Sequence, residues 1–388
     1  MKFAHIAILS AALATTIASY AQQSYTDALA SIESNNPTLR AIRQETDAQK
    51  AQSATSRKMP DLEVELGYLW PGRKDVSASQ PLDWSVMSGQ SRRLAEARDS
   101  LAESQYATSR QEILLDAHLT LIEATYQTAL TGLRSQRAEA LGRIALCVSR
   151  RLDAGDARQM DANNATMAYA SASRQLTLAQ ADLDDALIHL KALNGGEPLI
   201  PSIAQFPPAP MPADFDAWYA RAQRISPQLM SSAAQASIAR GERHQARMNA
   251  APQLSVGFMG EFSQEEKYKG VTLGISLPLW RSRQTRDAAA HAEQAATSRH
   301  NAAVLNDRAQ AEAAWNRALQ LGEIAKSMRQ AVSTTSNVDL LAKALDAGQI
   351  SVSECLTASA ILFEAEEDAL AAERDYQVAV ARLTACEL

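Results

Sequence analysis

Few side chains in this sequence are spaced in a way that could do chemistry. The histidines are scattered, and the cysteines, odd in number, lack the spacing of a metal site. No serine, histidine and aspartate set, glycine-rich phosphate loop or carboxylate pair stands out. We therefore expect no catalytic residue, no metal and no cofactor, and interpret the cysteines as small apolar residues. The residues considered are His5, His118, His189, His244, His291, His300, Cys147, Cys355 and Cys386.

The composition limits the partners and the type of core. The net charge of −6 is modest and negative, which argues against nucleic acid as a partner. Only 5% of the residues are aromatic and alanine is abundant, which favours closely spaced helices over a thick globular core. After the first residues, no stretch offers the roughly 20 consecutive apolar residues that a transmembrane helix needs. If the chain crosses a membrane, strands must do so.

The first 21 residues have the pattern of a secretory signal peptide. Lys2 precedes an apolar run from Ile6 to Ile17, and Ser19-Tyr20-Ala21 supplies the small residues of a cleavage site. We predict cleavage after Ala21 and export of the mature chain. No cysteine follows the cleavage point, so the sequence does not indicate an N-terminal lipid anchor.

The mature sequence consists of two copies of one plan. Four landmarks of the first copy recur in the same order 190 to 197 residues later, which indicates a tandem duplication. The matched segments are Asn36-Pro37-Thr38-Leu39 with Ser226-Pro227-Gln228-Leu229, Met59-Pro60 with Ala251-Pro252, Pro81-Leu82 with Pro278-Leu279, and Leu152-Asp153-Ala154-Gly155 with Leu345-Asp346-Ala347-Gly348. We therefore divide the chain into a signal peptide (1–21), a first repeat (22–197), a linker with six prolines (198–212) and a second repeat (213–388).

The placement of proline and glycine predicts the helices. No proline lies between Leu82 and Glu197 or after Leu279, and a proline inside a helix costs about 3 kcal/mol. Gly155 and Gly348 are expected to end helices in the left-handed conformation, so each copy predicts a helical hairpin. The segment 88–151 is longer than its returning partner 157–193, and we expect it to contact a helix at 24–58 as well. Its predicted coiled-coil seam is Leu115, Leu119, Ile122, Tyr126, Ala129 and Leu133.

Alternating apolar and polar residues predict strands near the prolines. The alternation is clear in 62–70 and 271–279. Segments of about nine residues with aromatic side chains near their ends match strands that cross an outer membrane. Glu63 and Glu65 fall on the polar face. They are candidates for a lumen-facing pair that favours cations, although ordinary solvation is the simpler interpretation.

The order of these parts resembles the outer-membrane efflux protein family of TolC over essentially the whole mature chain. The resemblance implies a mainly α fold with a small β part: duplicated long helical hairpins that build an α-barrel, and four strands that contribute to a trimeric twelve-stranded outer-membrane β-barrel. Four strands alone would leave edge groups unsatisfied in lipid, which also favours an oligomer. The family implies a passive efflux channel, a homotrimer in outer-membrane lipid with a periplasmic tunnel, an adaptor protein and an inner-membrane transporter.

The same resemblance implies the site residues. In the family, the turns after the longest helices form the periplasmic tip where the adaptor docks, and Leu152-Asp153-Ala154-Gly155 and Leu345-Asp346-Ala347-Gly348 match them. Family members often place an acid six residues after the tip glycine, with leucine two residues further on. Asp161 and Glu354 occupy the acid position and are candidate aperture residues. Leucine follows only in the second copy, because the first copy has Asn163 there.

Other classes of protein share parts of this plan. A periplasmic adaptor also has a coiled-coil hairpin, but one hairpin among short glycine-rich β domains, whereas this chain predicts two hairpins. A purely structural coiled coil would not need two pairs of amphipathic strands. Among channels, drug efflux, metal efflux and type I protein secretion share the subunit plan, and the sequence does not separate them.

Overall fold

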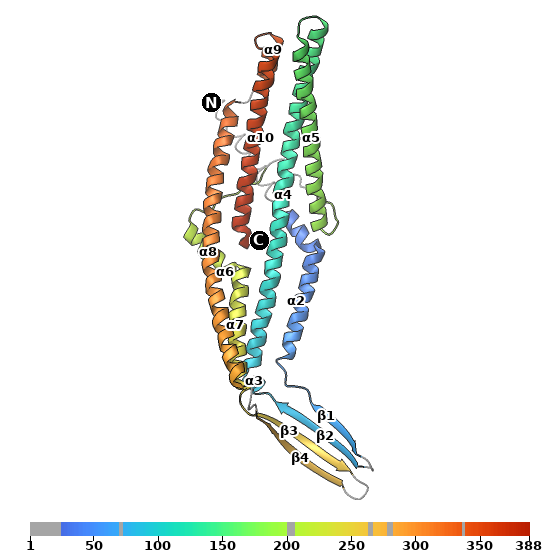
Figure 1. The fold of residues 1–388 in the computed structure, drawn as a ribbon, viewed down its shortest axis with the longest axis vertical. Helices are drawn as coiled ribbons and strands as arrows, with labels where there is room; N and C mark the ends of the chain where they lie inside the picture. The colour runs from blue at the N-terminus through green and yellow to red at the C-terminus, as the bar shows by residue number, and fades with distance from the viewer. Residues whose placement is uncertain (1–24, 70–72, 200–205, 263–266, 278–281, 336–337) are drawn as a thin grey trace, which may run out of the picture. The chain divides into compact units, whose positions relative to one another are not determined.

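The computed structural model describes residues 25–69, 73–199, 206–262, 267–277, 282–335 and 338–388 (Figure 1). The predicted signal peptide lies outside the described residues. The chain forms two compact units, each of which contains parts of both sequence repeats. The first unit comprises Met1–Pro37, Arg110–Ala220 and Gln310–Leu388, and the second comprises Thr38–Ser109 and Arg221–Ala309. Within the described residues, no helix combines the length and the apolarity needed to cross a membrane.

The elements follow the predicted order. A helix over residues 25–35 precedes the rest, and Figure 1 labels the elements that follow it. In the first repeat they are α2 (Pro37–Thr55), β1 (Glu63–Leu69), β2 (Arg73–Leu82), α3 (Trp84–Met87), α4 (Gln90–Asp153) and α5 (Gln159–Leu193). In the second they are α6 (Phe215–Ile225), α7 (Pro227–Met248), β3 (Gln253–Phe262), β4 (Lys267–Ser276), α8 (Ser282–Thr335), α9 (Val338–Asp346), α10 (Val352–Leu383) and the short 3-10 helix η1 (Thr384–Glu387). The mainly α fold with a small β part is confirmed.

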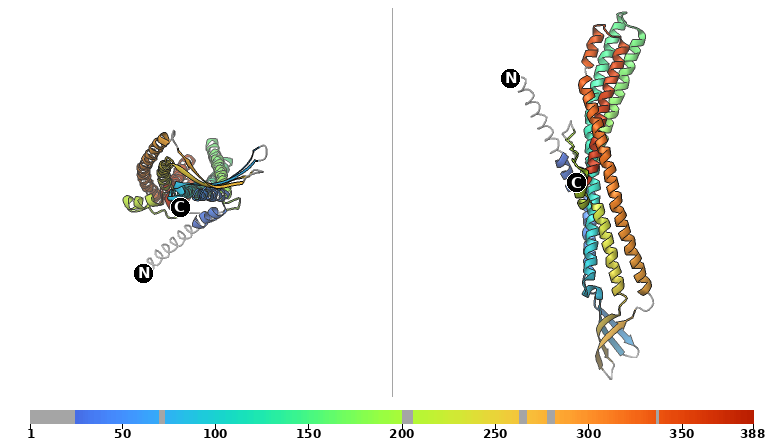
Figure 2. Two further views of the ribbon diagram at one scale, coloured as in Figure 1. Left: turned by 90° about the horizontal axis from the view of Figure 1, so that it is seen from below. Right: turned by 90° about the vertical axis from the view of Figure 1, so that its left-hand side faces the viewer.

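In the second unit, the four strands form one antiparallel sheet in the order β1-β2-β3-β4, and the strands twist across it (Figure 2). Residues directly opposite one another share a face. One such row is Val64, Ala78, Phe258 and Val271, and the next row, on the other face, is Glu65, Ser77, Met259 and Gly270. The register therefore confirms one apolar and one mostly polar face.

Helix α2 lies along the first part of α4, as predicted for the helix at 24–58. Arg43 and Lys50 of α2 both form ion pairs with Glu103 of α4, and Arg57 pairs with Asp99. The Lys50 ammonium holds the pKa of Glu103 below its ordinary value. These pairs are half-exposed, so they fix the alignment of the two helices more than they add stability.

The predicted single helix at 24–58 is wrong in one respect, because it is interrupted at Asn36. The Asn36 amide still donates to the Ile32 carbonyl (2.9 Å), and Pro37 then begins α2 without a backbone N–H to donate. The Asn36 side chain donates to the Leu193 carbonyl at the end of α5 (2.9 Å). The second copy has the same kind of helix start: Pro227 is the first residue of α7, and the side chain of Ser226 caps that helix.

The core of the first unit lies where the helix at 25–35 and α5 meet α4. Leu121 and Ile122 of α4 are buried with Ile32 and Leu190. The Tyr25 hydroxyl donates to the Leu121 carbonyl (3.1 Å) and lies 2.6 Å from the Thr125 hydroxyl. Burial raises the pKa of Tyr25 to about 12. This core holds together segments that are about 100 residues apart in the sequence.

The predicted seam of α4 is only partly correct. Ile122 and Tyr126 are buried, but Leu115, Leu119, Ala129 and Leu133 are only half-buried. Most of the residues that are buried instead lie on a neighbouring stripe of α4: Leu114, Ala117, Leu121, Ala124 and Leu130. The buried surface is wider than one seam because several helices surround this part of α4.

On α5, buried alanines recur every seven residues, and the small side chain lets the helices approach closely. They are Ala165, Ala172, Ala179 and Ala186.

The described end of the proline-rich linker lies against α10. The Gln377 amide donates to the Pro207 carbonyl (2.8 Å), and the Tyr376 hydroxyl donates to the Ala209 carbonyl (2.7 Å). Both carbonyls belong to a segment whose prolines have no backbone N–H, so side chains of the helix make the bonds that fix it.

Candidate docking tips and strand faces

The turn after α4 is a Schellman motif that ends on Gly155. The Gly155 amide donates to the Leu152 carbonyl (3.0 Å), and the Asp156 amide donates to the Arg151 carbonyl (2.7 Å). Gly155 has a φ of 82°, which a residue with a side chain rarely adopts. Asp153, Ala154 and Gly155 are exposed, and Leu152 is half-buried.

The turn after α9 has the same geometry. The Gly348 amide donates to the Leu345 carbonyl (3.0 Å), the Gln349 amide donates to the Ala344 carbonyl (2.9 Å), and φ of Gly348 is 68°. The repeated tetrapeptide therefore forms the same turn twice. Ala347 and Gly348 are exposed, whereas Leu345 is only 2% exposed; the side chain of Asp346 lies outside the description.

The two turns stand on a shared core in the first unit. Ile144 and Val148 of α4, Ala165 of α5, Leu345 of α9 and Cys355 of α10 belong to one buried cluster. Leu356 packs against this cluster, whereas Asn163, at the equivalent position of the first copy, is exposed. The missing leucine of the first copy therefore falls at a position that does not need an apolar side chain.

Glu354 has a local structural role that the sequence reasoning missed. It is the third residue of α10, and its side chain accepts from the backbone N–H of Ser351 (2.8 Å) while the Ser351 hydroxyl accepts from the Glu354 N–H (3.2 Å). This is a capping box. The backbone bond from Ser351, followed by the bond from its hydroxyl, lowers the pKa of Glu354. The spacing Ser351-x-x-Glu354 was the signal in the sequence.

Asp161 occupies the same position of α5, but without this arrangement. Its helix is preceded by Arg158, which makes no side-chain cap bond, and Asp161 is half-buried in the first turn. An acid there is favoured by the helix dipole. Both candidate aperture residues thus have a reason to be acidic within a single chain, and their placement at an aperture stays a prediction.

The pKa of Glu354 separates the two roles. If the capping box dominates, NMR titration of the assembled protein should give a pKa below the ordinary glutamate value, and Ser351→Ala should return it to normal. The box then stabilises the fold above the pKa of unfolded glutamate and is lost as pH falls through the lowered value. A pKa above the ordinary value would instead show that several carboxylates gather at an aperture.

The sheet register places Glu63 and Glu65 on the polar face. Glu63 lies opposite Ser79, and Glu65 lies opposite Ser77. Both carboxylates are exposed. Their position on the face opposite the apolar residues is as predicted, whereas their orientation toward a lumen stays a prediction.

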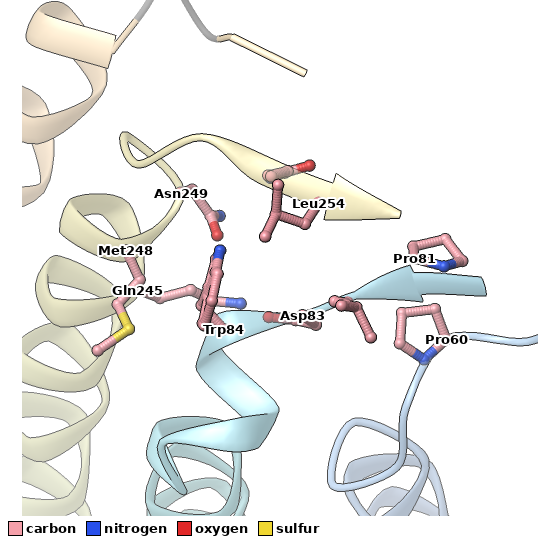
Figure 3. A pocket seen from close by; sticks show the side chains of 10 residues that line it. Pro60, Pro81, Asp83, Trp84, Gln245, Met248, Asn249 and Leu254 are labelled. Carbon is pink, nitrogen blue, oxygen red and sulfur yellow. The ribbon is translucent and has the colours of Figure 1, made fainter. Parts of the chain in front are cut away.

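A pocket in the second unit lies where the strands give way to the helices (Figure 3). It is lined by Pro60, Pro81, Leu82, Asp83, Trp84, Gln245, Met248, Asn249, Gln253 and Leu254. The Trp84 indole N–H donates to the Pro252 carbonyl (3.0 Å), and the Asp83 carboxylate accepts from the Ser85 N–H (2.7 Å) to cap α3. The bond from Trp84 to Pro252 joins the end of β2 to the start of β3. Trp84 therefore has a structural role in this connection beyond that of an aromatic side chain near a strand end.

The remaining chemical groups do not converge. His189 lies 3.3 Å from the Asp116 carboxylate and 3.4 Å from the Thr120 hydroxyl. Cys355 is buried, and Cys147 and Cys386 are half-buried. Over the described ranges, no three or more histidine, cysteine, aspartate or glutamate side chains are grouped as metal ligands would be.

Two long helical hairpins joined to a four-stranded antiparallel sheet define the fold of outer-membrane channels of the TolC type. A membrane protein from Pseudomonas aeruginosa is 15% identical to this chain, with a TM-score of 0.78, and the match covers 94% of this chain and 93% of that one.

Two further solved structures match in the same way. CusC, whose conformational changes accompany folding and transmembrane channel formation, is 15% identical (TM-score 0.76; 94% and 92% covered). The outer-membrane channel OprN is 16% identical (TM-score 0.75; 94% and 89% covered). No family model and no curated protein matches the sequence. The structural matches confirm the fold expected from the order of the sequence elements.

Proposed function

We propose that this chain is one subunit of a trimeric outer-membrane channel in a tripartite efflux system. It passes substrate outward from a periplasmic adaptor and an inner-membrane transporter and performs no chemical step itself. The observation that carries the proposal is a four-stranded sheet with one exposed apolar face and unpaired edges. Within the described residues, β1 and β4 are the edge strands.

The apolar face of this sheet is suited to contact with lipid. Val271 is 81% exposed, Leu66 is 76% exposed and Leu273 is 69% exposed. Leaving such side chains in water costs roughly 25 cal/mol for each Å² of apolar surface, and an exposed patch of this kind marks an interaction surface. The polar face, with Glu63, Glu65 and Ser77, suits a water-filled interior.

The open edges explain why more than one copy is needed. An unpaired backbone group in hydrocarbon costs several kcal/mol, so a sheet can cross a membrane only when its edges are closed. Four strands are too few to close on themselves. Three copies give twelve strands, a number within the range of known outer-membrane barrels.

The similar structures support the location. OprN is described as an outer-membrane channel, and CusC is described as forming a transmembrane channel. We infer the same location for this chain after removal of the signal peptide 1–21. We also infer that the two exposed Schellman turns are the docking tips for the adaptor.

Crosslinking tests the trimer. In mild detergent, the protein extracted from the outer-membrane fraction should give crosslinked species that stop at three subunits, and its migration on gels should change on heating. A monomer that is stable in detergent would contradict the closure argument. A soluble periplasmic monomer would remove the channel and favour the adaptor class instead.

A further inference from the structure

Helix α5 carries an exposed apolar stripe on a different side from its buried alanines. Met167 is 72% exposed, Leu178 is 48% exposed and Ile188 is 64% exposed. With 3.6 residues per turn, these three side chains fall within about 80° of one another around the helix. Ala172 and Ala179, which pack in the clusters that contain α4, lie about 100° or more away from Leu178 and Met167. An apolar stripe at this spacing is typical of a helix that packs against a second helix.

The second repeat shows what the equivalent stripe contacts. Helix α5 begins at Gln159 and α10 begins at Val352, so each position of α5 corresponds to the position 193 residues later in α10. The glycines of the two tips have the same offset. Leu178 corresponds to Ala371, which packs against the buried cluster around Tyr126 of α4. The stripe that is exposed on α5 is therefore covered on α10, and the helix that covers it belongs to the other repeat.

Two further positions of the stripe follow the same rule. Ile188 corresponds to Ala381, which is buried in the core cluster that contains the middle of α4. Arg174 corresponds to Glu367, which forms an ion pair with Arg134 of α4 (3.0 Å). At all three levels, the contact within the chain joins the second helix of one hairpin to the first helix of the other hairpin.

The order of the helices in the first unit shows which contact is left open. Figure 1 shows the four helices in the order α8, α10, α4 and α5, with ion pairs between α8 and α10 and between α10 and α4. Because the two hairpins are copies of one plan, the contact of α10 with α4 predicts a contact of α5 with an α8 helix. In one chain α8 and α5 are the outer helices of this set. The α8 helix that meets α5 must therefore come from a second copy.

Helix α8 has an open hollow where this contact would lie. Its positions correspond to those of α4 with an offset of 193 to 197 residues, taken from the tip glycines and the strand prolines. The difference is about one helical turn, so both offsets give the same face. Tyr126, which is buried, corresponds to Leu319 or Glu323, and Leu319 is 46% exposed. Both line a hollow of about 320 Å³ together with Gly322 and Met211. The equivalent place on α4 is the one that Ala371 covers.

Charge does not select the partner at this hollow. Its lining includes two acids, Glu323 and Glu373, and two bases, Lys326 and Arg329, so the formal charges balance. The apolar side chain that lines it on α8 is exposed in the single chain, as Leu178 is on α5. Covering both surfaces with one another removes apolar area from water on each side.

We propose that α5 of one copy places Leu178 in the hollow beside Leu319 and Glu323 on α8 of a second copy. The contact between copies then repeats the contact of α10 with α4 within one copy. Such a head-to-tail interface closes into a ring, in which each α5 stripe and each α8 hollow is covered once. This inference rests on the proposed function, because the trimer supplies the second copy.

Crosslinking between differently tagged chains tests the contact. Leu178→Cys and Glu323→Cys are expressed together as two single variants with different affinity tags, so only a bond between copies can join the tags. A short bismaleimide that spans about one helical turn should link them into a species that carries both tags. The matched control replaces Leu178→Cys by Gln180→Cys, an exposed position two residues along and on another side of α5, and should give no such species. Each variant expressed with tagged wild-type chain controls for the native cysteines.

Maleimide labelling of the same variants gives a second measurement. In the assembled trimer, Leu178→Cys should react at least about tenfold more slowly than Gln180→Cys, because a covered thiol reacts only when its contact opens. In detergent-denatured chains the two thiols should react equally fast.

The outcomes separate this inference from the proposed function. A trimer in the outer-membrane fraction in which Leu178→Cys does not crosslink to Glu323→Cys and is labelled as fast as Gln180→Cys would overturn the contact and leave the channel intact. Protection of Leu178→Cys that appears only when the adaptor is added would assign the stripe to the adaptor and overturn the second copy as its occupant. If the wild-type chain is neither trimeric nor in the outer membrane, the proposed function fails and the inference fails with it.

Discussion

Replacing Val271 by arginine is expected to cost about 2–4 kcal/mol of the stability of the membrane-inserted protein. Val271 lies in the middle of β4, on the apolar face, and is the most exposed of the apolar side chains on that strand. A guanidinium at mid-depth in hydrocarbon has neither water nor an acid to solvate it. Denaturant titration of the trimer in lipid vesicles measures the loss directly.

The neighbouring residue supplies the matched control. Thr272 is on the polar face, opposite Gly257, so Thr272→Arg should leave the inserted protein largely intact. Ile275→Arg, near the helix end of the same apolar stripe, should cost less than Val271→Arg because the penalty falls to about 0–1 kcal/mol near the interface. Equal losses at positions 271 and 272 would mean that the sheet has no lipid-facing side.

The long helices could be predicted from the sequence because their limits are set by local chemistry. The expected segment 88–151 corresponds to α4, Gln90–Asp153, since the absence of proline permits the helix and Gly155 ends it. The break at Asn36 was visible in principle, because proline is favoured as the first residue of a helix. Its repetition at Ser226-Pro227 is a second signal in the sequence, because Pro227 also begins a helix.

The buried stripe of α4 could not be predicted so well. A regular seam assumes one partner helix, whereas Tyr25, Leu190 and Ala381 approach the middle of α4 from three other segments. Burial there depends on which helices meet, and that is a tertiary property. The alternation of β1 and β4 was readable, but β2 carries mostly small and polar residues, so its place in the sheet comes from its pairing with β1 and β3.

The candidate tips could also be predicted only in part from the sequence. That Gly155 and Gly348 would be left-handed follows from glycine alone, and the structure confirms it. The structure was needed to show that the whole tetrapeptide forms the same hydrogen-bonded turn in both copies. What the turns bind depends on surfaces of another protein, so the docking role stays a prediction that only a binding measurement can test.

Removing the tip acids should weaken adaptor binding without damaging the tips. Asp153 and Asp346 are the last residues of α4 and α9, where the helix dipole places partial negative charge. An acid at this end is unfavourable to its own helix, by roughly 0.3–1 kcal/mol. Its presence in both copies is accounted for if a basic group of a partner approaches it. Asp153→Ala with Asp346→Ala should therefore leave helix stability unchanged or slightly higher.

The two effects of this double variant have opposite signs, which makes the result decisive. Each lost acid should weaken adaptor binding by about tenfold, the equivalent of a charge-assisted hydrogen bond of roughly 1.5 kcal/mol, as measured by surface plasmon resonance with the adaptor captured from the same cells. The control is Asp156→Gln, which gives the first turn the residue that Gln349 supplies in the second; it removes one exposed acid just outside the helix and should change nothing. If the double variant binds the adaptor as tightly as the wild type does, while both reach the outer membrane as trimers, the Leu-Asp-Ala-Gly turns are helix ends only.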